Sequence, residues 1–115
     1  AGGVAAFWTR EERSREQRRG IGGEGAGTVS RRMRDDTDVP RHQQWILRLP
    51  SGHTLKCAHN IDLAQRIDSL QVGDSIRFRG RYEFNEKGGV IHWTHRDPQS
   101  GHARGWIEHG GRSYE

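Results

Sequence analysis

Residues 75–84, with the sequence SIRFRGRYEF, decide the fold of this chain. From Ile76 to Phe84, apolar residues recur at every second position, and arginine or glutamate fills every position between them. This alternation is typical of a β-strand with one buried and one solvent-facing side. Gly80 interrupts the apolar row, where a barrel strand has to bend sharply. The stretch therefore predicts one strand of a small, closely curved sheet.

The same period-two pattern predicts strands on both sides of this stretch, and Pro50 to Gly52 reads as a hairpin turn between two of them. Asn60 is a good N-cap, so a short helix is expected over residues 61–67. The other predicted strands cover residues 26–34, 42–49, 53–59 and 90–95.

The order of three strands, one short helix and two strands is that of an oligonucleotide/oligosaccharide-binding (OB) barrel. We therefore expect a mainly β fold, with a five-stranded OB-like barrel over residues 25–98. A partly open sandwich of the same strands is the alternative. Residues 1–24 are expected to form an N-terminal helical arm with a glycine hinge, and residues 99–115 an irregular C-terminal tail.

Composition limits the choice of partners and compartments. The 115 residues make one small domain, and a formal charge of +4 favours polyanions, although it is also compatible with ordinary solubility. Cys57 is the single cysteine, so an internal disulfide and a thiolate zinc site are excluded. No apolar run is long enough to span a membrane. The start at Ala1 without Met fits a mature end after signal cleavage or another processing boundary; we expect the first, and with it export to the periplasm or outside the cell.

Three arginines on the solvent side of the central strand predict a nucleic-acid surface. Arg77, Arg79 and Arg81 are spaced about 7 Å apart, which suits successive phosphates of an extended single strand. Trp45 or Trp93 would supply base stacking. The alternative is a solvated outer face whose arginines prevent aggregation.

A second cluster suggests general acid–base chemistry at one rim of the barrel. Imidazoles can exchange protons near neutral pH, and a nearby arginine can stabilise charge developing on a phosphoryl group. Structural hydrogen bonds at the barrel ends are the alternative role for these histidines. The candidate catalytic residues are Arg41, His42, His59, His95 and Asp97.

No cofactor is expected, but a divalent metal is an option. His92, His95 and Asp97 are the residues that would bind it. Residues three apart on a regular strand face opposite sides, so His92 and His95 could share a metal only if the strand ends or bulges at Thr94.

The pieces HNIDLA (residues 59–64) and GGVIHWTHRDP (residues 88–98) carry a family resemblance. Together with the Arg41–Gln43 triplet, they make residues 25–114 resemble a bacterial family of small, often exported proteins of unknown function. The resemblance implies export. It carries over no catalytic residue, because no activity is established for the family.

Two functional hypotheses remain at this point. The first is an exported OB-like domain that binds single-stranded nucleic acid, with cleavage of phosphodiester bonds by the rim cluster as a further step. The alternative is a non-enzymatic structural or self-assembly module, which would associate through residues 1–24.

Overall fold

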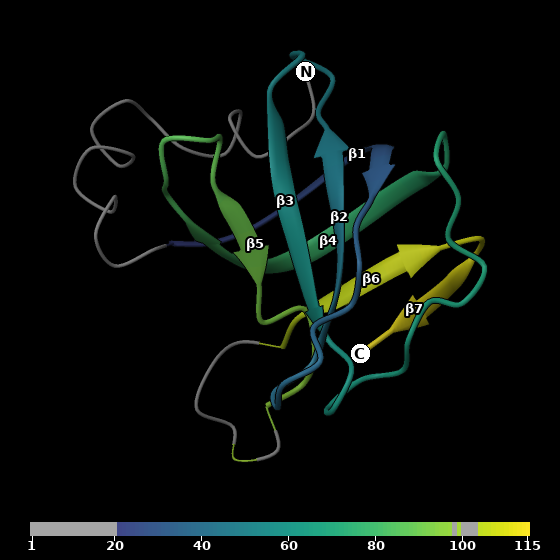
Figure 1. The fold of residues 1–115 in the computed structure, drawn as a ribbon. Coiled ribbons are helices and arrows are strands. Elements are labelled where there is room, and N and C mark those ends of the chain that lie inside the picture. The colour runs from purple at the N-terminus through teal and green to yellow at the C-terminus, as the bar shows by residue number, and fades with distance from the viewer. Residues whose placement is uncertain (1–20, 98, 100–103) are drawn as a thin grey trace.

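The computed structural model describes residues 21–97, 99 and 104–115, and these residues form a mainly β fold (Figure 1). Five strands close a barrel and two more extend it at one edge. They are β1 (Ile21–Arg32), β2 (His42–Arg48), β3 (Thr54–Asn60), β4 (Ser75–Glu83), β5 (Val90–His92), β6 (Trp106–His109) and β7 (Arg112–Tyr114).

The barrel closes because β1 pairs with two different strands. Its first part runs antiparallel to β4 and its second part runs antiparallel to β2, so that Thr28 lies opposite both Ser75 and Arg48. A bulge between Val29 and Arg31 turns the strand at this point. The strand order is β1-β2-β3-β5-β4, with β4 back beside β1, and only the β3–β5 pair is parallel.

The predicted alternation is confirmed for the central strand and its neighbours. Ile76 and Phe78 on β4 are buried, as are Trp45 on β2 and Cys57 on β3. Phe84 was expected on the same buried side, and this was wrong. It follows the last residue of β4, where the strand pairing has ended, and 46% of its surface is exposed.

The helix predicted over residues 61–67 is absent, and a turn takes its place. Asn60 does cap the backbone N–H groups of Asp62 and Leu63, but the chain makes only one turn. The next backbone groups bond to barrel side chains instead. The buried Gln43 amide both donates to the carbonyl of Ile67 and accepts from its N–H, at 2.8 Å each. A helix would have to give up these bonds.

Two expectations about the ends of the barrel also differ from the structure. Residues 21–24, expected in a glycine hinge, belong to β1, because β4 offers them a strand to pair with. The segment expected as an irregular tail contains β6 and β7, which continue the sheet beyond β4. The helix expected in the N-terminal arm lies outside the described residues. Within the described segments, no helix has the length and apolar character needed to cross a membrane.

Candidate functional site

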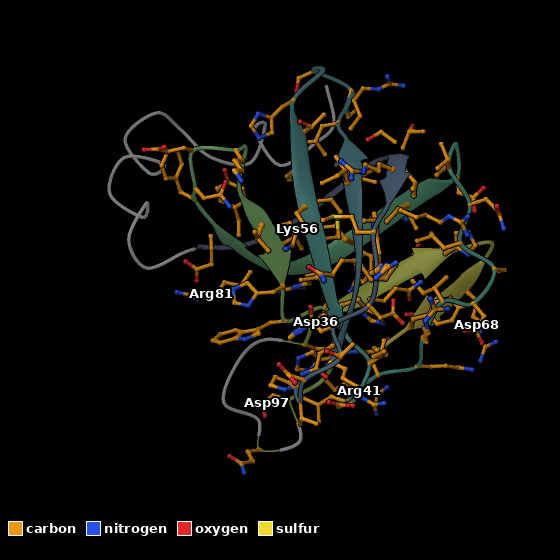
Figure 2. The ribbon with its side chains drawn as sticks, viewed as in Figure 1. Asp36, Arg41, Lys56, Asp68, Arg81 and Asp97 are labelled. Carbon is orange, nitrogen blue, oxygen red and sulfur yellow. The ribbon has the colours of Figure 1, made fainter. Side chains whose placement is uncertain are left out.

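The outer face of β4 carries a row of arginines flanked by two tryptophans. Arg79 lies opposite Trp106 of β6 in the strand register, and the Arg77 guanidinium carbon lies 5.9 Å from the Trp106 ring centroid. At the other end of the row, the Arg81 guanidinium carbon lies 5.4 Å from the Trp93 ring centroid. We call these five residues the tryptophan–arginine strip. Figure 2 shows Arg81 at the edge of the molecule, pointing outward.

Glutamates beside the strip make only loose contacts with it. Glu108 lies 3.4 Å from Arg77, and Glu83 lies 3.5 Å from Arg81. Contacts of this length between exposed side chains contribute about 0–1 kcal/mol. A bound anion can therefore replace them at little cost.

Next to the strip, the side-chain carboxylate of Glu115 bonds to two arginines. Glu115 contacts Arg104 at 2.5 Å and Arg96 at 2.6 Å. Hydrogen bonds from Arg104 and then Arg96 lower the pKa of Glu115 to about 2. The Glu115 side chain is therefore ionised at neutral pH and holds both arginines beside the strip.

Trp93 has a backbone conformation that bulky residues rarely adopt. Its φ is +57°, in the left-handed region, and it is the one residue other than glycine with a positive φ in the described part of the chain. The conformation shifts the inside–outside alternation after β5. Ile91 and then Thr94 point inward and are fully buried, whereas 40% of the Trp93 surface is exposed. Holding a bulky side chain there costs about 1–2 kcal/mol.

Two glycines make room for the backbone of this turn. A Cβ on Gly80 would lie 2.5 Å from the carbonyl oxygen of His92. A Cβ on Gly105 would collide with the Trp93 carbonyl oxygen, and the Gly105 N–H donates to the carbonyl of His95 at 3.1 Å. The turn at Trp93 is therefore enclosed on both sides by close backbone contacts.

A buried histidine holds the same turn from inside the barrel. His59 is fully buried, its Nε2 lies 3.0 Å from the carbonyl of Gln65, and its Nδ1 lies 2.7 Å from Thr94 Oγ1. A carbonyl can only accept, so Nε2 donates and Nδ1 accepts from the Thr94 hydroxyl. Burial, together with repulsion from His95 and His42, lowers the pKa of His59 to about 4. The imidazole is therefore neutral at neutral pH and fixes Thr94 directly after Trp93.

The predicted catalytic rim is only partly assembled. His42 and His95 do come close enough to His59 to repel its charge. However, His42 Nδ1 bonds to Asp36 at 2.9 Å, and His95 is 4% exposed with Nδ1 only 2.7 Å from the Arg96 carbonyl. His59 is enclosed and cannot reach a substrate.

Arg41 and Asp97, at the same end of the molecule in Figure 2, also have structural partners. The Arg41 backbone N–H and guanidinium both bond to Asp62, at 2.7 and 2.8 Å, and these bonds hold the pKa of Asp62 below its usual range. Asp97 accepts from the backbone N–H of Gln99 at 2.9 Å. These contacts favour the structural interpretation of the rim.

The structure does not bring the other predicted binding residues into one site. Trp45 was expected to stack on bases, but it is fully buried in the barrel core and cannot contact a ligand. His92 lies on the outer side of β5 while His95 is buried, and the described residues contain no group of three side chains suited to a metal. Trp106 was missed as a stacking residue. The alternation of Trp106, Ile107 and Glu108 was the available signal for a strand there.

A family model described as "Protein of unknown function (DUF3465)" matches residues 5–115. The chain belongs to this family. The match includes the HNIDLA and GGVIHWTH pieces and extends into the segment before residue 25, where no resemblance was noted from the sequence. No curated protein and no solved structure matches the chain.

In this DUF3465 domain, replacing Trp93 tests the left-handed turn. Glycine adopts φ +57° without strain, whereas alanine does not. We expect Trp93→Gly to be more stable than Trp93→Ala by about 1 kcal/mol in urea unfolding at pH 7. Equal stability, or a more stable alanine variant, would contradict the conformation described for Trp93.

The buried His59 predicts a pH dependence of folding. Its pKa falls from 6.5 to about 4 on folding, so the unfolded chain binds more protons between these values. Stability should then be complete above pH 6.5 and should decline by about 3 kcal/mol as the pH falls towards 4.

The measurement is urea unfolding at several pH values, with His59→Gln as the control because glutamine cannot titrate there. His92, whose pKa is also lowered by burial, titrates in both proteins. The parent should lose more stability than His59→Gln over this range. Parallel pH profiles for the two proteins would rule out a neutral, buried His59.

Proposed function

We propose that this DUF3465 domain binds single-stranded nucleic acid along the tryptophan–arginine strip and does not cleave it. The strand order β1-β2-β3-β5-β4, closed by β1 against β4, supports an OB-type barrel. OB barrels bind extended oligomers on their outer surface. This analogy raises the expectation of an oligomeric ligand, while the choice of nucleic acid depends on the side chains of the strip.

The observation that carries the proposal is the exposed, strained Trp93. The left-handed backbone conformation of Trp93 costs about 1–2 kcal/mol, and 40% of its surface is nevertheless exposed; strained, exposed positions of this kind cluster at functional sites, which supports a binding role. Stacking of a base on an aromatic ring contributes about 1–3 kcal/mol, which exceeds or matches the backbone cost. The strip has one tryptophan ring near each end, Trp93 beside Arg81 and Trp106 beside Arg77.

The arginines between the two rings suit a phosphate backbone. Alternate residues of a strand are about 7 Å apart, close to the spacing of phosphates in an extended single strand. Phosphates would replace Glu108 and Glu83, which contact Arg77 and Arg81 at 3.4 and 3.5 Å. Because the binding energy comes from stacking and charge, little dependence on sequence is expected along most of the strip.

The structural contacts of the rim residues argue against cleavage. His59 uses both ring nitrogens in buried hydrogen bonds and stays neutral down to a pH near its lowered pKa of about 4. His42 and Arg41 are paired with Asp36 and Asp62. Export and self-association through residues 1–24 remain predictions.

Fluorescence anisotropy with an end-labelled single-stranded DNA or RNA tests the proposal. We expect binding that weakens as salt rises, and a loss of about 5- to 150-fold in affinity for Trp93→Gly, since one stacked base contributes about 1–3 kcal/mol. Arg79→Ser should reduce the slope of log affinity against log salt by about 1. Lys87→Ser is the matched control, because Lys87 lies in the loop after β4, outside the strip.

The outcomes of this experiment are distinct. Wild-type affinity for Trp93→Gly, or equal effects of Arg79→Ser and Lys87→Ser, would overturn the proposed interface. Fragment length is read from the same samples with and without chelator. Intact strands are expected in both, and shortened products lost in His59→Gln would restore the catalytic role of the rim.

A further inference from the structure

A hollow opens beside the Trp106 end of the strip. It lies over β4, β6 and β7, and its volume of about 420 Å³ falls within the range of small-molecule sites, about 300–1,000 Å³. Its lining residues are Arg79, Arg104, Trp106, Glu108, Ser113 and Glu115. The hollow is therefore large enough to hold a flat heterocycle, and it is next to the surface proposed for the nucleic-acid backbone.

The lining offers one aromatic ring, two guanidiniums and two carboxylates, and Arg104 and Glu115 are already bonded to each other. Trp106 and Glu108 are two residues apart on β6, so their side chains are on the same side of the strand. Arg79 lies opposite Trp106 on the neighbouring strand. A base stacked on Trp106 would therefore have the Arg79 guanidinium and the Glu108 carboxylate within reach at its edges.

Guanine is the base whose edges match this pair of side chains. It has two adjacent donors, the ring N1–H and the N2 amino group, and a carboxylate can accept hydrogen bonds from both in a bidentate pair. Its O6 and N7 are two adjacent acceptors, which are the usual partners of an arginine. Adenine, cytosine and uracil lack this combination of two adjacent donors beside two adjacent acceptors.

We propose that this hollow is a guanine subsite, in which Trp106 stacks on the base, Glu108 accepts from N1 and N2, and Arg79 donates to O6 and N7. The proposal rests on the proposed function, because it assigns a base preference to one end of the same strip. Glu108 is 41% exposed and its contact with Arg77 is 3.4 Å long, so it can turn towards a base without breaking a strong bond.

A competition experiment with single-stranded DNA tests the subsite. The probe is a labelled oligo-dT, and the competitors are oligo-dT strands that carry one dG, one deoxyinosine or one 7-deaza-dG at the same position. Inosine lacks the N2 amino group and 7-deazaguanine lacks N7. Lithium buffer prevents guanine quadruplexes from forming. We expect the dG strand to bind about tenfold more tightly than either analogue or plain oligo-dT, as lost bidentate base contacts predict.

Glu108→Gln should abolish the preference for dG while leaving the affinity for plain oligo-dT unchanged or slightly higher. Glu24→Gln is the matched control. Glu24 lies opposite Arg79 on the other neighbouring strand, β1, and does not line the hollow. It should retain the full preference. Urea unfolding of both variants checks that each is folded.

Each outcome has a separate meaning. Binding of oligo-dT with no gain from dG would overturn the guanine subsite and leave the proposed function standing. Preference for dG that survives in Glu108→Gln, or that is lost equally in Glu24→Gln, would also overturn the subsite. No binding of any strand would overturn both proposals.

Discussion

The buried imidazole of His59 is the contact on which the arrangement of this molecule depends. It joins three parts of the chain: strand β3, the turn segment at Gln65, and Thr94, which lies 35 residues after His59, just beyond the end of β5. A buried polar group of this kind is stable only when each of its nitrogens has a partner. Both partners are present, so the loss of either one would leave a buried group unsatisfied and would release one of the joined segments.

The consequence for function is that an interior hydrogen bond determines an exterior surface. Thr94 is drawn inward by His59, and the residue before it is left outside in a left-handed conformation. Trp93 is therefore presented to solvent beside Arg81, instead of joining the core as the strand alternation would require. This local shift places Trp93 in the five-residue strip, and the pairing of β6 with β4 places Trp106 there.

The alternation in residues 75–83 predicted the central strand and the outward arginines, because burial of every second residue is a local property of a strand. The short helix was predicted wrongly because two buried barrel side chains bond to the backbone of this segment: Gln43, which is distant in sequence, bonds to Ile67, and His59 bonds to the carbonyl of Gln65. The left-handed turn at Trp93 could not be predicted either, because it depends on the close approach of its backbone to Gly80 and Gly105. Trp45 could not be separated from Trp93 by residue type, because only the strand register decides which ring is buried.

The most direct test of the account is a two-dimensional NMR titration that follows the tryptophan indole N–H signals while an oligo-dT strand is added. Trp45 is an internal control, since it is fully buried in the core. The account predicts that the indole signals of Trp93 and Trp106 shift together as the strand binds, while the signal of Trp45 stays in place. A strand that binds without moving the Trp93 signal would contradict the central claim that this strained ring is the binding platform.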